Sequence, residues 1–416
     1  MNSDRTIKQI LTVTQEGIVD TPSLVFTEMD LAKNFQAFKS GMQALENRSK
    51  IFFPIKACYE PEVIRTLDAM GIDGFEVMSA HELRHIRQAL GRYPSLIMTG
   101  NGRTEDDLKI ASTSGAIIVI DSISDATLIS NFAQKIDHPF KILLRLIFPD
   151  ESLSSDEMGY KNPSCKVGVV PFSAEFFRIL EILLANPLLQ VVGLHCHQQI
   201  QQTDSVVYLE NLSKIKETIP FIESSFGREL ELIDIGGGFE HLSSEKIEHL
   251  MKMISFEFQN LFPEKKLIIE PGRAMVGSAG YVVTRVIDVK TKQGVTNIFV
   301  DAGTNLLVPT SSKRYKLHYP EPSSEGLRVN IVDGVLSPSN IIVEQQNLSE
   351  LPKLGSLMLL GNCGAYTTVL EHQWLRPLHP VFFFEKSGKI KNIFTRRQAF
   401  EMWRLRYGTD ISPSEG

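Results

Sequence analysis

Eight short apolar runs, each followed by a stretch with helical spacing of apolar residues, recur between residues 23 and 275. The runs are nearly continuous in apolar residues, which is typical of parallel strands that are buried on both faces. Eight such units favour a closed (β/α)8 barrel of about 250 residues, with a doubly wound open sheet as the alternative. The expected strands span residues 51–57, 74–78, 95–99, 116–121, 141–147, 190–195, 229–235 and 266–270.

The pattern changes after Arg273, where short strand-like runs follow one another with few helical patterns between them. Pro, Gly, Ser and Asn separate these runs, as in the turns of a β domain. We therefore expect an α/β chain with a barrel over residues 23–280 and a mainly β domain from residues 1–22 and 281–416. Strands of the β domain are expected at 281–289, 297–301, 328–333, 341–344, 356–360, 381–385 and 390–396, and a helix at 398–407.

Composition and charge restrict the partners and the compartment of the chain. The 43 Lys and Arg residues against 49 Asp and Glu give a net charge of −6, which is unfavourable for a protein that binds a nucleic acid. The apolar runs are too short to span a bilayer, so no membrane partner is expected. Four scattered cysteines without a CxxC spacing argue against a disulfide framework or a zinc site and favour a reducing, cytoplasmic compartment.

The carboxyl ends of the expected barrel strands carry polar residues and glycines that would meet at one mouth of the barrel. These residues are Lys56, Ser79, Asp121, Arg145, His195, His197, Gly236, Gly237, Gly238, Glu270 and Arg273. Each has a simpler explanation when it is taken alone. These explanations are a surface lysine, a hydrogen-bonded pair of core histidines, a tight glycine turn, and an ion pair between Glu270 and Arg273. The two histidines supply too few ligands for a metal site.

Taken together, the same residues match the needs of one cofactor. Lys56 lies within an apolar run, and a lysine withdrawn from water is a nucleophilic amine suited to Schiff-base formation. Residues 236–238 precede a helical pattern and can present backbone N–H groups to a phosphate. The carboxylate of Glu270 can bind a protonated ring nitrogen. An amine, a phosphate cradle and a partner for a ring nitrogen are the anchors that pyridoxal 5'-phosphate requires.

With these motifs the chain resembles the fold-type III pyridoxal-phosphate-dependent decarboxylases, the ornithine/diaminopimelate decarboxylase family, which shares its barrel with alanine racemase. The resemblance runs from about Thr21 to Trp403, and is densest in the segments Pro54–Ala57, Gly193–His197, Asp234–Gly238, Glu270–Arg273, Asp301–Gly303 and Gly364–Tyr366. It implies a homodimer with active sites at the subunit interface. It also implies that Lys56 forms the Schiff base with the cofactor and that His197 stacks on the cofactor ring.

The resemblance assigns the remaining cofactor contacts residue by residue. It implies that Glu270 binds the ring nitrogen. The implied phosphate contacts are Gly236, Gly237, Gly238, Arg273 and Tyr366, and the implied supporting contacts are Glu76, Ser79 and Arg145.

The segments that contact the substrate in this family differ in the present chain. The family's Cys-Glu-Ser-Gly-Asp segment falls at residues 334–340, where there is no cysteine and Asn340 stands in place of the aspartate. The acid that protonates the α-carbon of the substrate is therefore open, with His372, Ser337 and Lys56 as candidates.

We expect an enzyme, a pyridoxal-phosphate-dependent carboxy-lyase that decarboxylates an amino acid or amino-acid conjugate through a Lys56 Schiff base. Its specificity is expected to differ from that of the ornithine and diaminopimelate enzymes. By resemblance, the Glu270 carboxylate favours decarboxylation, since alanine racemases place an arginine there. Two alternatives stay open: an amino-acid racemase or epimerase, and a catalytically silent regulatory paralogue. The presence of Lys56, the glycine run and Glu270 argues against the silent paralogue.

Overall fold

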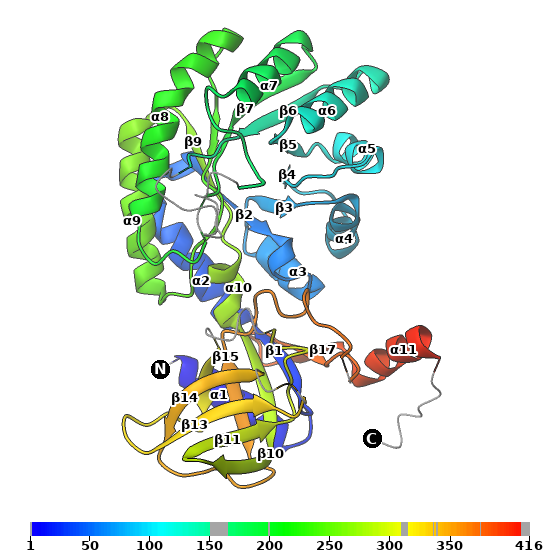
Figure 1. Cartoon of the computed structure of the whole chain (residues 1–416), viewed down its shortest axis with the longest axis vertical. Coiled ribbons are helices and arrows are strands. Elements are labelled where there is room, and N and C mark those ends of the chain that lie inside the picture. The colour runs from blue at the N-terminus through cyan, green and yellow to red at the C-terminus, as the bar shows by residue number, and fades with distance from the viewer. Residues whose placement is uncertain are drawn as a thin grey trace. The chain divides into compact units, whose positions relative to one another are not determined.

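The computed structural model describes residues 2–149, 165–198, 200–308, 315–335, 337, 340–374 and 376–408. The chain divides into two compact units (Figure 1). The barrel unit comprises Lys33–Lys56 and Ile64–Ala274, and the sheet unit comprises Met1–Ala32, Ala57–Val63 and Met275–Gly416. These limits differ from the expected boundary at residue 23, because residues 23–27 pair with strands of the sheet unit.

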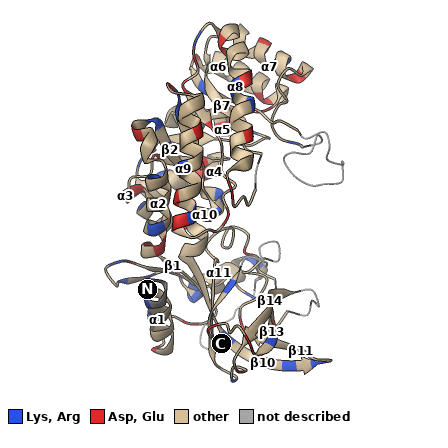
Figure 2. Ribbon diagram, turned by 90° about the vertical axis from the view of Figure 1, so that its left-hand side faces the viewer, with Lys and Arg blue, Asp and Glu red and all other residues tan. Residues whose placement is uncertain are grey.

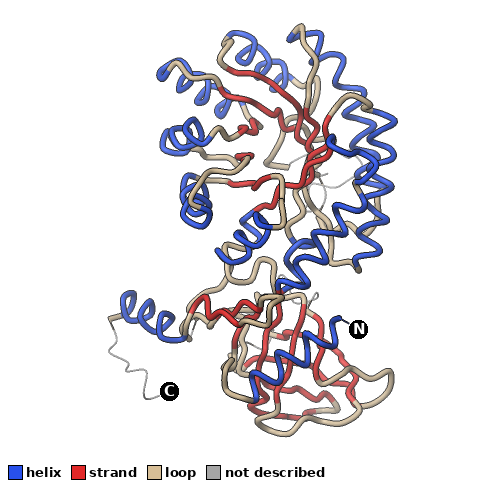
Figure 3. The backbone as a smooth tube through the Cα atoms, turned by 180° about the vertical axis from the view of Figure 1, so that it is seen from behind, coloured by secondary structure: helices blue, strands red, loops and turns tan. Residues whose placement is uncertain are grey.

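The barrel unit contains a closed barrel of eight parallel strands in sequential order, which confirms the expected fold class (Figure 3). Every run that was expected to be a barrel strand forms one. The strands are β2 (Ser49–Pro54), β3 (Gly74–Val77), β4 (Leu96–Met98), β5 (Ile117–Ile120), β6 (Phe140–Arg145), β7 (Leu189–His195), β8 (Leu232–Asp234) and β9 (Lys266–Ile269). Their apolar side chains pack into one buried cluster of Phe52, Ile97, Val119, Leu143, Leu232 and Ile268.

Helices alternate with the barrel strands, and several begin directly after a strand end. Ser79 and Ser122 each lie two residues after the end of a strand and accept a hydrogen bond from an N–H group in the first turn of the next helix. Such a cap keeps the loop short and fixes the strand end at the barrel mouth. The helices are α2 (Glu28–Gly41), α3 (Pro61–Ala69), α4 (Ala80–Leu90), α5 (Glu105–Ser114), α6 (Ile123–Ile136), α7 (Ala174–Ala185), α8 (Val206–Phe226), α9 (Ser244–Leu261) and α10 (Arg273–Val276).

The sheet unit is built on a nine-stranded, mainly antiparallel sheet, as expected for the β domain. Its main path runs in the order β14, β13, β11, β10, β1, β16, β17, while β15 pairs with β10 and β12. The strands are β1 (Ser23–Thr27), β10 (Gly280–Lys292), β11 (Val295–Val300), β12 (Lys316–Tyr319), β13 (Leu327–Asp333), β14 (Ile341–Leu348), β15 (Leu357–Gly361), β16 (Val381–Phe384) and β17 (Ile390–Phe394).

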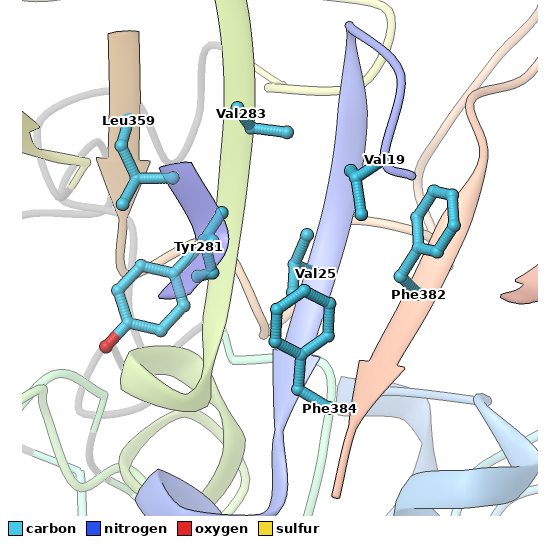
Figure 4. Close-up of a cluster of buried hydrophobic side chains, with 8 residues drawn as sticks. Val19, Val25, Tyr281, Val283, Leu359, Phe382 and Phe384 are labelled. Atoms are coloured by element: carbon cyan, nitrogen blue, oxygen red, sulfur yellow. The ribbon is translucent and has the colours of Figure 1, made fainter. Parts of the chain in front are cut away.

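Among the described residues, the α-helices that lie wholly in the sheet unit are α1 (Asn2–Gln15) and α11 (Arg396–Tyr407). The helix at α11 agrees with the expectation, whereas α1 was not predicted. Ile10 of α1 is fully buried in a cluster with apolar residues from four strands of the sheet. Figure 4 shows this cluster, with Val25, Tyr281 and Phe382 among its labelled members. Helix α1 is therefore part of the core of this unit, because its apolar face covers the sheet.

None of the helices that the structure describes is long and apolar enough to cross a membrane. Acidic and basic residues are interspersed along the outer helices of the barrel (Figure 2). This mixture of charges agrees with the modest net charge of −6.

Candidate active site

The amine of Lys56 is held at the carboxyl end of the first barrel strand. Lys56 lies in a single 3₁₀ turn, Ile55–Ala57, directly after β2. Its Nζ donates to both carboxylate oxygens of Glu76 on β3, each at 2.9 Å, and the Thr99 hydroxyl donates to the same carboxylate. The Glu76 side chain is 0% exposed and the Lys56 side chain 32% exposed. Lys56 is thus an oriented amine that solvent and small molecules can still reach.

The glycine segment after β8 is packed against a histidine that follows β7. The Gly237 N–H donates to His197 Nδ1 at 3.3 Å. A Cβ atom on Gly236 would lie 2.6 Å from the His197 ring, and one on Gly237 would lie 2.3 Å from the backbone oxygen of Glu270. Close approach, and not only a tight turn, therefore requires glycine here. The expected cradle and its neighbouring imidazole are brought together.

Glu270 directly follows the last barrel strand, β9, and lies in a buried polar cluster. It is 3% exposed, and its Oε2 lies 3.8 Å from Nε2 of His195. No described residue donates a hydrogen bond to Glu270 Oε1. An unpaired, buried carboxylate oxygen is what a protonated ring nitrogen would bind, so these residues fit pyridoxal phosphate. Asp234 completes the cluster, with one ligand atom from each of the three residues within 4.8 Å of the others.

The electrostatic surroundings of this cluster are partly positive. Burial raises the pKa of Glu270, while the charges of Lys56 and Arg145 act in the opposite direction. Burial, followed by the charge of Arg145, lowers the pKa of His195 well below its usual value, so the imidazole is neutral at pH 7.

The other expected barrel residues also lie at strand ends. Arg145, the last residue of β6, is 9% exposed, and its Nη2 donates to the His197 carbonyl at 3.5 Å. Arg273 begins α10, three residues after Glu270. Ser79 caps α4 by accepting a hydrogen bond from the Glu82 N–H at 3.3 Å. The contacts therefore join Arg145 to the site, while the hydrogen bond found for Ser79 is that of a helix cap.

The remaining expected residues belong to the sheet unit. The Tyr366 N–H donates at 2.8 Å to the carbonyl of Ala57, the residue after Lys56. Tyr366 has a left-handed φ of 57°, a strained conformation for a bulky residue that is common at functional sites. His372 is exposed, its N–H donates to the Asn305 carbonyl at 3.0 Å, and its ring centroid lies 6.2 Å from that of Trp374.

Within residues 334–340, where the family's cysteine-containing motif would fall, the described polar residues Ser337 and Asn340 are half-buried and buried, respectively. Asn340 is 8% exposed, and its amide donates to Thr304 Oγ1 at 2.7 Å. Asp333, 3% exposed, accepts hydrogen bonds from both the backbone and the hydroxyl of Thr304. Ser337 is half-buried. Asn340 thus serves the internal packing of this unit.

The buried carboxyl group of Glu60 is expected to make the stability of the sheet unit depend on pH. Burial raises its pKa to about 7, against a hydrogen bond from Thr368 and with added repulsion from Glu371. Because the pKa of Glu60 in the folded protein exceeds its ordinary value of 4.5, stability is lost as pH rises between these two values. We expect Glu60→Gln to raise the free energy of unfolding by about 1–3 kcal/mol at pH 8 and by much less near pH 5.

Urea unfolding of both proteins at the two pH values checks this expectation, with the exposed Glu321→Gln as the control. An equal effect of Glu60→Gln at both pH values would contradict it.

Three contributors to the site were not assigned a role from the sequence. Thr99 bonds Glu76, Tyr208 donates from its buried hydroxyl to the Gly237 carbonyl at 3.1 Å, and Asp234 binds the Gly236 N–H at 2.8 Å. Thr99 and Asp234 stand at strand ends, so the rule that found Lys56 could have found them. Tyr208 lies on a helix and carries no comparable signal.

Comparisons with known proteins agree with this geometry. Residues 29–277 match the family model described as "Pyridoxal-dependent decarboxylase, pyridoxal binding domain". The chain is 26% identical to a probable chloroplastic diaminopimelate decarboxylase of Oryza sativa over 393 residues, which cover 92% of this chain and 78% of the relative. It is also 26% identical to the diaminopimelate decarboxylase of Archaeoglobus fulgidus over 367 residues, with 85% of each chain covered.

Solved structures show the same fold. A diaminopimelate decarboxylase from M. jannaschii superposes with a TM-score of 0.83 at 20% identity, covering 97% of this chain and 94% of the other. A lysine decarboxylase from Selenomonas ruminantium superposes with a TM-score of 0.74 at 20% identity, covering 94% and 98%. The family model spans more than half of the sequence. The chain therefore belongs to the pyridoxal-dependent decarboxylase family and is, by this membership, a pyridoxal-phosphate-dependent carboxy-lyase.

Proposed function

We propose that the chain decarboxylates an amino acid or an amino-acid conjugate at the barrel mouth, with Lys56 as the amine that holds the cofactor. The observation that carries the proposal is the buried Glu270 carboxylate, whose Oε1 receives no hydrogen bond from an N–H or hydroxyl group of the described residues. An unsatisfied buried acceptor costs about 1–3 kcal/mol, more when it is charged, so this oxygen favours a donor from outside the chain. A protonated pyridine nitrogen is such a donor.

Each residue of the site would have a distinct role in binding the cofactor. When bound, pyridoxal phosphate supplies a carbon that reacts with amines and a ring that accepts the electron pair left by departing carbon dioxide. Glu270 would keep the ring nitrogen protonated, and His197 would cover one face of the ring. The Gly236–Gly238 segment, Arg273 and Tyr366 would bind the phosphate. Glu76 orients the Lys56 amine through two hydrogen bonds.

We further propose that the substrate specificity has diverged from that of the related enzymes. Residues 334–340 contain no cysteine, and the Asn340 amide is used within the sheet unit. The relatives are described as diaminopimelate and lysine decarboxylases, which makes basic amino acids the starting point of a substrate search. The proton donor to the α-carbon would be His372, Ser337 or Lys56 itself.

The test is carbon dioxide release by the purified protein, loaded with pyridoxal phosphate, from a panel of L- and D-amino acids and their N-acyl conjugates. The panel includes lysine, ornithine and meso-diaminopimelate. We expect rapid release from one class of compound, and slower release from ornithine and diaminopimelate. Exchange of the α-proton in D₂O without carbon dioxide release would instead identify a racemase. A protein that binds the cofactor and catalyses neither reaction would be a silent paralogue.

Two further proposals concern the assembly and the compartment. We propose a homodimer with active sites at the subunit interface, by resemblance to the family, and sedimentation velocity tests it directly. A monomer that is fully active at high dilution would contradict it. The four cysteines are free thiols, which supports a reducing, cytoplasmic compartment.

A further inference from the structure

Asp234 connects the elements that would hold the two ends of the cofactor. It is the last residue of β8 and is 0% exposed. Its Oδ1 accepts a hydrogen bond from the Gly236 N–H at 2.8 Å, and the Gly236 carbonyl accepts one from the Glu270 N–H, also at 2.8 Å. Two successive hydrogen bonds therefore link Asp234 to Gly236 and Gly236 to Glu270 across the ends of β8 and β9.

The side chains of Asp234 and Glu270 also contact each other. An oxygen of the Asp234 carboxyl group lies within 4.8 Å of an oxygen of the Glu270 carboxyl group, and both side chains are almost completely buried. Two carboxylates can share a hydrogen bond only when one of them carries a proton. Two bare negative charges at this separation, away from water, would repel each other strongly. The pair therefore holds one proton.

The surroundings decide which carboxyl group keeps that proton. Burial, followed by repulsion from Glu270, raises the pKa of Asp234 well above its usual value, and Glu76 adds to the repulsion. Glu270 faces the charges of Lys56 and Arg145, which favour its anion. The neighbouring His195 is buried and neutral, so it does not compete for the proton. The proton thus belongs to Asp234 and the negative charge to Glu270.

We propose that Asp234 is a positioning residue: as a neutral acid it donates to the Glu270 carboxylate and accepts from the Gly236 N–H, so one side chain sets both the ring-nitrogen partner and the phosphate cradle. The inference rests on the proposed function in that it takes Glu270 as the partner of the ring nitrogen. The protonation of Asp234 does not depend on a bound cofactor, so it can be measured in the cofactor-free protein.

The first test therefore uses the cofactor-free protein. Infrared spectra of protein with ¹³C-labelled aspartate should show, at pH 8, an isotope-shifted carbonyl stretch of a protonated carboxylic acid. Asp234→Asn should remove this band. Glu270→Gln removes the repulsion that adds to burial in raising the pKa of Asp234, so the band should disappear at a lower pH than in the wild-type protein. An unchanged spectrum in Asp234→Asn, or the lack of any such band, would overturn the inference whether or not the protein is a decarboxylase.

The second test measures the affinity for pyridoxal phosphate. An asparagine amide can donate to Glu270 and accept from Gly236, so Asp234→Asn should retain the affinity within a few-fold. Asp234→Ala makes neither bond and should weaken binding by about 10–100-fold, the usual effect of removing a group that orients a ligand-binding residue. Thermal unfolding of both variants shows whether each is folded. Equal affinities in the two folded variants would contradict the positioning role, even if carbon dioxide release had already been observed.

Discussion

Replacing Lys56 with alanine is expected to lower the rate of carbon dioxide release by about 10³-fold or more, because the amine that would hold the cofactor is lost. The absorption band of the protein-linked cofactor should disappear, and borohydride should no longer fix the cofactor to the chain. The fold should persist, since the Lys56 side chain is 32% exposed and Glu76 keeps the hydrogen bond from the Thr99 hydroxyl.

The matched control is Lys50→Ala on the same strand. Lys50 lies on β2 beside Ile268 of β9, six residues before Lys56 and towards the other end of the barrel. This variant should keep both the absorption band and the activity. An unaltered band in Lys56→Ala would contradict the assignment of Lys56 as the cofactor amine. A lost band with activity intact would contradict the need for that linkage in turnover.

The second large effect is expected from Gly237→Ala. The new methyl group would lie 2.3 Å from the backbone oxygen of Glu270, so either the glycine segment or the end of β9 must move. Overpacking of this kind costs about 1–3 kcal/mol. Because the same movement displaces Glu270 and the phosphate cradle together, the affinity for pyridoxal phosphate should fall by about 10–100-fold. Urea unfolding and a cofactor titration measure the two effects.

Gly115→Ala separates the local steric effect from a general effect of adding a methyl group. Gly115 has a φ of 71° and open space around its Cβ position, so alanine there should cost about 1 kcal/mol through backbone conformation alone. Cofactor affinity should stay at the wild-type value. If Gly237→Ala and Gly115→Ala bind the cofactor equally well, the glycine segment is not the cradle.

The barrel and its polar mouth could be predicted from the sequence because both follow from local patterns. Continuous apolar runs mark buried parallel strands, and the residue types at their carboxyl ends then select Lys56, His197 and Glu270. Strand β1 looks the same in sequence as a barrel strand. Its place in the sheet depends on pairing with residues 280–283 and 381–384, which no local pattern encodes.

The chemistry inside the site was less predictable than its location. Lys56 reads in the sequence as a lysine within an apolar run, whereas the structure pairs it with both oxygens of Glu76. Asp234 could be placed at a strand end, but its contact with Glu270 depends on how the ends of β8 and β9 approach each other. Pairings across strands are set by the closed barrel, so they become visible only in the folded chain.

The position of β1 between β10 and β16 has a consequence for how the protein is made. Leu24 is paired with Val282 on one side and with Val381 on the other, so the sheet cannot be completed until nearly the whole chain has left the ribosome. The barrel strands, by contrast, all pair with partners between residues 49 and 269. The barrel can thus form during synthesis, whereas β1 lacks one of its two partner strands until β16 has been made. A nascent chain that stalls before β16 would leave one edge of β1 unpaired, which makes premature termination an aggregation hazard for this protein.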